Sequence, residues 1–392
     1  MALTPEQLEI LGDEIAPIYQ QMEQDVINDI IRRIAGAKRW TETAELQATS
    51  LQKLGYSPTE IQKEVLKKLG ANKEYQKWLA TETVAYKQEV KKLIKDIVDE
   101  AKDAGDELIA AAGAMAWNED MRIWSRAGKK LKTTGVASRT VRLFKKRLNK
   151  DLKNITRTTA FKEMGGGLTK TMDAFHKEMD IAMAKVASGT FTYQKAMEDA
   201  TARLAQSGIR AVDYASGITR NVDAAARLCL QTTSSQLAGA VSMYNAEEMG
   251  EDLVEVSSHM GARSDGSYGP SDHAHWQGKV YSISGSSHPD ESRRLGYPIK
   301  KLAIATGYPD NPRGLCGYNC AHTFYTFFEG ISEPNPVEET PPPVTINGKE
   351  YTYYQATQKQ RQYEREIRAL KRQQACGINT KARINQKTAE YN

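Results

Sequence analysis

Histidine and cysteine side chains gather in one stretch of this 392-residue sequence, residues 256–328. Five of the six histidines and two of the four cysteines fall inside it, together with tryptophan, arginine and several glycines. Imidazole nitrogen and thiolate sulfur are the ligands that zinc prefers, arranged as a tetrahedron of four. The sequence therefore predicts a small, tightly organised domain with a candidate Zn²⁺ site. The candidate ligands are His275, Cys316, Cys320 and His322.

The spacing of these residues is Cys-x3-Cys-x-His, with the last two at the start of a predicted strand. Because they are two apart on a strand, Cys320 and His322 should point to the same face. Cys316 precedes them in a glycine-flanked loop, and one histidine of the pair His273 and His275 completes an N2S2 set, for which we take His275. A bound ion would hold a small, loop-rich domain together. The alternative is that the cysteines are small buried residues and the histidines only form hydrogen bonds.

The same stretch also contains groups suited to two kinds of catalysis. A metal-dependent nuclease would use histidine and carboxylate groups around a divalent ion to activate water. Cys316 or Cys320 beside a histidine would make a thiol nucleophile. Neither arrangement is accompanied by a characteristic sequence block, so we predict that the chain is not an enzyme. The nuclease candidates are Asp272, His273, His275, Asn319 and His322.

A second candidate site is a basic stretch from Arg122 to Lys162, in which fourteen lysines and arginines accompany one acidic residue, Asp151. On a helix, several of these cations share one face and apolar residues such as Phe144 and Leu148 form the other. Such a face neutralises the phosphates of a nucleic acid or pairs with an acidic protein. It also occurs on ordinary solvated helices, and no base-reading motif accompanies it. The candidate contact residues are Arg139, Arg142, Lys145, Lys146, Arg147, Lys150 and Lys153.

Upstream of the histidine-rich stretch, the sequence has the pattern of long solvated helices rather than alternating strands and helices. Capping boxes at Thr4–Gln7 and Ser57–Glu60 mark two helix starts. Apolar residues at helical spacing predict a third helix over residues 73–116. Three glycines at residues 165–167 interrupt the pattern, and we interpret them as a hinge. Later helices are expected at residues 169–187, 193–205 and 222–249.

From residue 251 onward the pattern changes to short strands, a linker and a charged tail. A proline-rich linker follows the strands, and Asn347-Gly348 indicates a hairpin turn. A charged helix is expected over residues 354–375, and a mobile end over residues 376–392. The strands are expected at residues 252–257, 278–283 and 323–328, with a short helix at 298–305.

The predicted fold class is mainly α, with an elongated helical N-terminal body, a small α+β C-terminal domain and a C-terminal helical tail. A chain of 392 residues is long enough for more than one core, so several domains are expected. The predicted division is a helical N-terminal region, a central helical region, the His/Cys-bearing α+β domain, and a tail made of the linker, the hairpin and the charged helix. These regions span residues 1–164, 165–250, 251–332 and 333–392.

Composition and charge limit the partners and the cellular compartment that fit this protein. The net charge is only +5, so the chain as a whole does not require a polyanionic partner. Four irregularly spaced cysteines do not form a disulfide framework, which indicates a reducing compartment. The first residues lack the features of a signal peptide, and no apolar run is long enough to span a bilayer. We therefore expect a protein made in the cytoplasm that acts without membrane insertion.

Six blocks of this sequence, taken together and in order, carry a resemblance to a known family. They are Gly208–Gly217, Glu247–Gly250, Gly261–Arg263, His275–Tyr281, Gly314–His322 and Tyr354–Lys371. These blocks resemble the phage minor capsid protein 2 family of tailed bacteriophages. The resemblance covers about residues 169–374, while the preceding residues share only the family's helical character. More distantly, the sequence is similar to a broader head-morphogenesis family whose members share a Cys/His-bearing C-terminal module.

The resemblance implies a structural virion protein, present in few copies inside the head or at its portal vertex, that acts in head morphogenesis or in DNA packaging and delivery. It implies the portal protein, the major capsid protein or both as partners, and contact with packaged DNA. It supports the structural importance of His275, Cys316, Cys320 and His322 and assigns no catalytic residue. Two alternatives stay open: a metal-dependent nuclease or processing enzyme of packaging, and a DNA-binding protein ejected with the genome.

Overall fold

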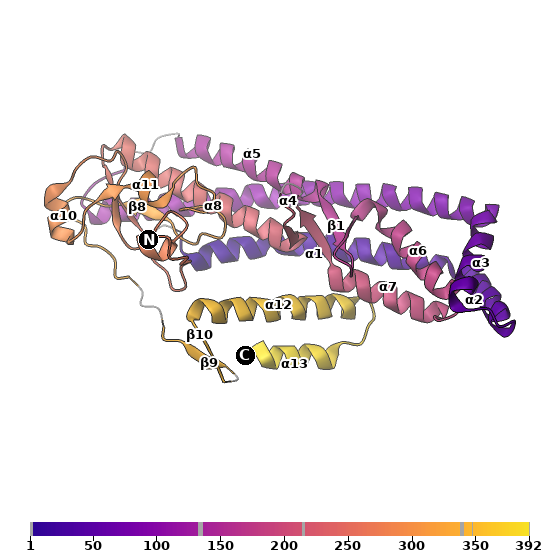
Figure 1. Cartoon of the computed structure of the whole chain (residues 1–392). Coiled ribbons are helices and arrows are strands. Elements are labelled where there is room, and N and C mark those ends of the chain that lie inside the picture. Colours follow the sequence, from indigo (N-terminus) through magenta and orange to yellow (C-terminus); the bar gives the residue numbers. More distant parts are fainter. Residues whose placement is uncertain (1–2, 132–135, 214–215, 338–340, 347, 392) are drawn as a thin grey trace. The chain divides into compact units, whose positions relative to one another are not determined.

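A computed structural model describes residues 3–131, 136–213, 216–337, 341–346 and 348–391. Most of these residues are helical, with two small sheets and a two-stranded hairpin (Figure 1), so the predicted mainly α class with a small α+β region is confirmed. The longer helices are α1 (Pro5–Gly36), α2 (Lys38–Lys53), α3 (Pro58–Ala71), α4 (Lys73–Arg126), α5 (Val136–Arg157), α6 (Ala174–Ala187), α7 (Tyr193–Ser207), α8 (Val222–Glu248), α12 (Tyr353–Ala375) and α13 (Lys381–Tyr391). The short helices are η1 (Thr171–Asp173), α9 (His273–Trp276), α10 (Pro289–Leu295) and α11 (Leu302–Thr306).

The chain divides into two compact units, and each unit is assembled from three separated segments. Long helices such as α1 and α4 contribute residues to both units. These units do not test the division into four consecutive regions that the sequence predicts, so that division stays a prediction. Unit 1 consists of residues 1–17, 101–153 and 226–359, and unit 2 consists of residues 18–100, 154–225 and 360–392.

Unit 1 contains a four-stranded sheet in the order β7-β6-β5-β8. β5 pairs antiparallel with β6 and β8, while β7 runs parallel to β6 at the edge. Helix α8 packs closely on the sheet, since a Cβ placed on Gly239 would lie 2.9 Å from the ring of Phe324. The short helices α10 and α11 gather with the sheet at one end of α8 (Figure 1). The strands are β5 (Leu253–Val256), β6 (Val280–Ser282), β7 (Lys300–Lys301) and β8 (Phe324–Thr326).

The sequence predicted the main elements of this sheet. Strands β5, β6 and β8 fall within the three expected stretches, and α11 overlaps the short helix expected before β8. The predicted hairpin is present as β9 (Val344–Ile346) paired antiparallel with β10 (Lys349–Tyr351). Asn347 of its turn lies outside the described residues, and Gly348 has a left-handed φ of 75°. None of the described helices combines the length and the hydropathy that a bilayer span requires.

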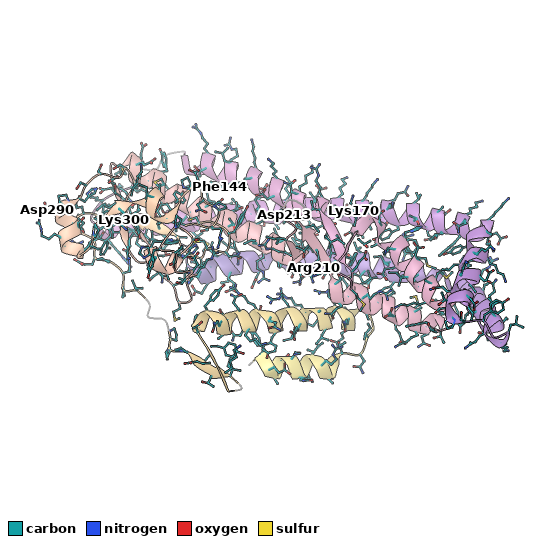
Figure 2. All side chains as sticks on the ribbon, in the orientation of Figure 1. Phe144, Lys170, Arg210, Asp213, Asp290 and Lys300 are labelled. Atoms are coloured by element: carbon teal, nitrogen blue, oxygen red, sulfur yellow. The ribbon has the colours of Figure 1, made fainter. Side chains whose placement is uncertain are left out.

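Unit 2 packs α2, α3, α6 and α7 together and carries a second sheet in the order β2-β1-β3-β4. All its pairings are antiparallel, and Ala160 of β1 pairs with Lys170 of β2 on one side and with Arg210 of β3 on the other. Figure 2 labels Lys170 and Arg210 on these two outer partners of β1. The sequence did not predict this sheet, because strands of three or four residues are too short for a period of two to be recognised. Its strands are β1 (Thr159–Lys162), β2 (Leu168–Lys170), β3 (Ile209–Val212) and β4 (Thr219–Asn221).

The three glycines at residues 165–167 have a different role from the one predicted. They lie in the turn between β1 and β2, where the N–H of Glu163 donates to the carbonyl of Gly167 over 2.8 Å. Gly166 has a φ of 87°, which L-residues rarely adopt. The interpretation of this segment as a hinge between helices was therefore wrong, and the following helix α6 begins at Ala174, later than expected.

Local capping explains where the N-terminal helices begin. The hydroxyl of Thr4 accepts from the N–H of Gln7 at 3.2 Å, and the side chain of Gln7 accepts from the N–H of Thr4 at 2.8 Å. Ser57 and Glu60 form the same reciprocal pair at the start of α3. Both predicted capping boxes are confirmed, and each satisfies backbone donors that have no partner inside the helix.

The C-terminal part of α12 is fastened within unit 2 by polar contacts. Arg372 forms an ion pair with buried Glu23 at 3.4 Å and donates to the carbonyl of Ala205 at 2.9 Å. Ala369 and Leu370 of the same helix are buried beside these contacts. Helix α13 follows in the stretch that was expected to be a mobile end, where the sequence predicted no helix.

Candidate functional site

The structure brings two of the four predicted ligands together and adds a different histidine. The ligand atoms of His273, Cys320 and His322 all lie within 4.8 Å of one another. His273 comes from α9, and the other two come from the loop that leads into β8. All three side chains are buried in unit 1. This group, which we call the candidate metal centre, offers one sulfur and two nitrogen ligands.

The other two predicted ligands, His275 and Cys316, lie outside this group. Residues two apart on a helix point about 200° apart around its axis, so His273 and His275 of α9 cannot face the same centre. The ring of His275 instead stands edge-on to Tyr268, with 5.1 Å between ring centroids. The thiol of Cys316 donates to the backbone carbonyl of His322 at 3.7 Å, and the hydroxyl of Ser235 on α8 donates to the same carbonyl at 3.3 Å. The sequence treated the two histidines as equivalent because it did not predict α9.

Gln277 fixes the tautomer of His322. Its side-chain oxygen accepts a hydrogen bond from the backbone N–H of His259 at 3.1 Å, and the same oxygen lies 2.9 Å from Nε2 of His322. Because this oxygen can only accept, Nε2 of His322 carries the proton. Nδ1 of His322 therefore keeps its lone pair, and it lies 3.6 Å from Sγ of Cys320.

A backbone carbonyl fixes the tautomer of His273 in the same way. Nε2 of His273 lies 2.8 Å from the carbonyl oxygen of Arg313, so the proton is on Nε2 and the lone pair is on Nδ1. Arg263 donates to the same carbonyl at 3.3 Å and to the carbonyl of Tyr318 at 3.0 Å, which fastens the loop that supplies the acceptor. Ligand histidines in metalloproteins donate their second N–H to such acceptors, which orients the ring. Both imidazoles thus have the hydrogen bonding of metal ligands.

Two separations inside the group fit those around a tetrahedral ion. With Zn–N about 2.05 Å and Zn–S about 2.3 Å, a nitrogen and a sulfur on one ion lie about 3.6 Å apart, and two imidazole ring centres lie about 5.2 Å apart. Nδ1 of His322 and Sγ of Cys320 are 3.6 Å apart, and the ring centroids of His273 and His322 are 5.3 Å apart. A weak hydrogen bond accounts for the first distance by itself, but the two distances together fit a shared ion.

Burial controls the protonation of the ligands. It lowers the pKa of His273 to about 4 and the pKa of His322 well below its ordinary value. Both imidazoles are therefore neutral near pH 7, as metal ligation requires. Burial also raises the pKa of Cys320 to about 11, so the metal-free protein carries a thiol there and loading an ion displaces its proton. The pKa of Cys316 is raised by burial as well, which disfavours the thiolate that a cysteine nucleophile needs.

The loop before β8 can fold tightly beside the centre because it contains two glycines. A Cβ on Gly314 would lie 2.2 Å from a backbone oxygen, and a Cβ on Gly317 would lie 2.4 Å from another. Neither contact can be relieved by moving a side chain, so both positions require glycine. Cys316 and Asn319 of the same loop have left-handed φ values of 58° and 56°. The loop is therefore held in a conformation that few sequences adopt.

A different histidine of unit 1 has hydrogen bonds that are unsuited to a metal. The two ring nitrogens of His288 lie 2.8 Å from a carboxylate oxygen of Asp252 and 3.0 Å from one of Glu329. Partial burial lowers the pKa of His288, but the hydrogen bonds to both carboxylates outweigh this effect and raise it. When both nitrogens carry protons, this imidazolium links the start of β5 to the segment after β8 and has no lone pair for an ion.

The second candidate site is the exposed face of α5. Lys145 is half-buried, and the other six predicted contact residues are exposed; we call these six the basic ridge. The opposite face packs on α4 in unit 1, where a Cβ on Gly113 would lie 2.6 Å from Val141 and one on Gly105 would lie 3.0 Å from Leu148. The residues of the basic ridge are Arg139, Arg142, Lys146, Arg147, Lys150 and Lys153.

The basic ridge carries a large excess of positive charge. Within the described ranges, Arg139, Arg142 and Lys146 form no salt bridge. Arg147 and Lys150 interact with the carboxylate of Asp151, the one acidic residue of α5, which is half-buried. At 1.5 Å per residue, the ridge extends over about 21 Å of helix. Cations at intervals of three or four residues along a rigid helix produce a continuous positive potential. This surface suits a polyanion or an acidic protein.

Long helices, a buried histidine–cysteine cluster and a cationic helix face are the main features of the described chain. The family model described as phage minor capsid protein 2 matches residues 3–75 and 59–391, which is nearly the whole chain. The chain therefore belongs to the phage minor capsid protein 2 family, and the N-terminal helices are part of the match as well. It is a structural protein of the phage capsid, located in the virion and in contact with other virion proteins. No curated protein and no solved structure matches the chain.

Proposed function

We propose that this minor capsid protein acts at the portal vertex or the inner surface of the head, where it binds the portal protein, the major capsid protein or both. There it takes part in head morphogenesis and in DNA packaging or delivery. Membership of a capsid family supports the location in the head. The observation that carries the DNA-related part is the basic ridge, because its six cations face solvent on a helix whose other face is packed and which has one acidic residue.

The basic ridge is proposed to contact packaged double-stranded DNA. Duplex DNA carries one negative charge per about 1.7 Å, so a ridge of about 21 Å meets enough phosphates to pair each of its cations. Leu148 and Val141 anchor α5 on α4, so the cations are presented by a fixed helix rather than a disordered arm. The contact would be independent of sequence, because backbone charge is the feature recognised.

The ion proposed for the candidate metal centre is zinc. A set of neutral imidazoles and a thiolate suits zinc better than magnesium or calcium, which prefer oxygen ligands. The ion would connect α9 to the loop before β8 and would contribute to the stability of unit 1 rather than to a reaction. Its ligands from the group would be His273, Cys320 and His322.

The DNA contact is tested by measuring the affinity of the full-length protein for a duplex of about 30 base pairs at several salt concentrations. The logarithm of the affinity should fall linearly with the logarithm of salt concentration, and the slope should shrink by about 0.9 for each cation–phosphate pair that a substitution removes. The variant Lys146→Gln/Lys150→Gln should therefore lower the slope by up to about 1.8. An acidic protein as the true partner would leave only weak DNA binding, which the ridge variant would not change.

The matched control removes two other exposed cations of unit 1, Lys300 and Lys301 on β7. The Lys300→Gln/Lys301→Gln variant has the same change in net charge, so any difference from the ridge variant reports position rather than total charge. Equal slopes for the two variants would rule out the basic ridge as the contact. Intact DNA after incubation with Mg²⁺ or Mn²⁺ is also expected, whereas cleavage that disappears in His322→Ala would favour the processing-enzyme alternative.

The proposed location is tested on particles. Virions reconstructed without imposed icosahedral symmetry should show density for this chain at the portal vertex or on the inner shell, and particles lacking the chain should show assembly or packaging defects. Finding the protein in infected cells but not in particles would contradict the proposal. A distribution over the outer faces of the head would contradict the inner location and leave the family assignment intact.

A further inference from the structure

Three protein ligands leave one corner of a tetrahedral ion unfilled. A structural zinc site takes four protein ligands, whereas a catalytic site keeps one position for water or substrate. The candidate metal centre supplies His273, Cys320 and His322. The identity of the fourth group therefore decides whether this centre holds the fold together or exposes a reactive ion.

His259 is anchored directly beside the centre. Its ring lies over that of His322, with 4.2 Å between the centroids and 39° between the planes. Its backbone N–H donates to the side-chain oxygen of Gln277, the same atom that accepts from His322. The loop that carries His259 follows β5, so it approaches the centre from a third segment, distinct from α9 and from the loop before β8.

The ring of His259 has the same pattern of hydrogen bonds as the two ligand histidines. Its Nδ1 lies 2.7 Å from the carbonyl oxygen of Met260, so Nδ1 carries the proton and Nε2 keeps a lone pair. In the described part of the chain, this Nε2 has no hydrogen-bond partner. Three histidines around one cysteine thus each commit one nitrogen to a neutral oxygen and leave the other available. His288, with carboxylates at both nitrogens, does not share the pattern.

Three other side chains are candidates for the fourth corner. The thiol of Cys316 donates to the backbone carbonyl of His322 at 3.7 Å, and His275 stands on the opposite side of α9 from His273. Asp272 is buried, and one of its oxygens accepts from the N–H of Tyr268 at 3.2 Å. Its other oxygen has no partner among the described residues. Neither this carboxylate nor the ring of His259 belongs to the group of mutually close ligand atoms, so either one would have to move to reach the ion.

We propose that His259 is the fourth ligand of the centre, so that three imidazoles and one thiolate enclose a structural ion. This inference rests on the zinc centre of the proposed function and specifies its ligand set. Two ligand rings on one ion have centres about 5.2 Å apart, so the ring of His259 must move outward by about 1 Å from its present position over His322. His259 is half-buried, and Gly261, two residues further along the chain, has a φ of 73°.

Cobalt(II) tests the ligand set, because it occupies zinc sites and its visible spectrum reports coordination. The full-length protein, kept reduced and stripped of metal with a chelator, is titrated with Co²⁺, and zinc affinity is then measured by competition. The parent protein should show the intense ligand-field bands of four-coordinate cobalt and a sulfur-to-cobalt charge-transfer band. In His259→Ala the charge-transfer band should remain, because Cys320 is unchanged, while the ligand-field bands weaken as water enters. Zinc affinity should fall roughly 100-fold.

Two further variants make the test specific. His275→Ala removes the same side chain from the neighbouring helix α9 and should leave both the spectrum and the affinity unchanged. His259→Cys places a thiolate at the proposed corner and should restore most of the affinity while strengthening the charge-transfer band. An unchanged spectrum and affinity in His259→Ala would overturn this ligand assignment and leave the zinc centre standing. A parent protein that binds neither cobalt nor zinc would overturn the zinc centre itself.

Discussion

The candidate metal centre and the basic ridge both use chargeable side chains of unit 1, but they are built in opposite ways. In the metal centre, His273 and His322 are buried and each has one nitrogen fixed by a neutral acceptor. On the basic ridge, six exposed cations accompany one acidic residue of the same helix, Asp151. Burial with directed lone pairs suits one small ion, whereas an excess of exposed positive charge suits an extended polyanion. The first arrangement should act on stability and the second on binding.

The largest expected difference between the two regions comes from removing the metal. An ion that binds only the folded state stabilises it by about 4 kcal/mol when its free concentration is a thousand times Kd. The unfolding midpoint of zinc-loaded protein in urea should therefore fall when a chelator is added, while DNA affinity measured under native conditions should change little. In Cys320→Ser the chelator should have no effect on the midpoint. Equal stability of the parent with and without zinc would show that the centre does not stabilise the fold.

Substitutions on the two faces of α5 should separate stability from binding. Leu148→Ala removes a fully buried side chain packed at Gly105 and should cost about 2–4 kcal/mol of unfolding free energy. Lys146→Gln, on the basic ridge, should change the unfolding free energy by less than about 0.5 kcal/mol and should weaken DNA binding. Urea denaturation and duplex binding of both variants provide the measurements. A destabilisation by Lys146→Gln as large as that by Leu148→Ala would show that the ridge is part of the fold.

Gln277 tests whether hydrogen bonds around the ligands prepare the metal centre. Gln277→Ala removes the acceptor that orients His322 and should weaken zinc binding by about 10–100-fold, which is about 1.4–2.7 kcal/mol. Gln277→Glu keeps acceptor oxygens at this position and should lose less affinity. Competition with a zinc-sensitive dye measures both variants. If alanine and glutamate lower the affinity equally, the hydrogen bond does not position the ring.

The sequence predicted those parts of the fold whose signals are local. Capping at Thr4 and Ser57 marked helix starts, and the pairing of Cys320 with His322 followed from their spacing of two near a strand. The sheet β2-β1-β3-β4 was missed because its strands are too short to show a period. Helix α9 was missed for the same reason, at four residues, and with it the choice between His273 and His275.

The hydrogen bonds that orient the histidines of the candidate metal centre have no signature in a single sequence. The acceptor of His273 is a backbone carbonyl, that of Arg313, and any residue at that position supplies one. Gln277 acts through an oxygen shared by His259 and His322, which meet only in the folded chain. The basic ridge was easier to predict, because the spacing of charged residues along one helix indicates which face is exposed to solvent.

The smallest expected effect concerns His288, which shows what distinguishes a ligand histidine from a charged one. Hydrogen bonds to Asp252 and Glu329 raise the pKa of His288 despite the opposing effect of partial burial. A raised folded-state pKa gives stability that is complete below the ordinary histidine pKa of about 6.5 and is lost as the pH rises through the folded value. Parent protein should therefore exceed His288→Gln in unfolding free energy by more at about pH 6 than at about pH 8.5.

Urea denaturation at the two pH values, with zinc held saturating, isolates this effect from the metal centre. Glu329→Gln removes one of the two carboxylates that face the ring, so the parent-to-variant difference should again be larger at the lower pH, where the imidazolium is present. If the advantage of the parent over His288→Gln instead grows with pH, the imidazole is neutral in the fold. His288 would then be a neutral histidine like His273, and hydrogen bonds to carboxylates would not distinguish a charged histidine from a metal ligand.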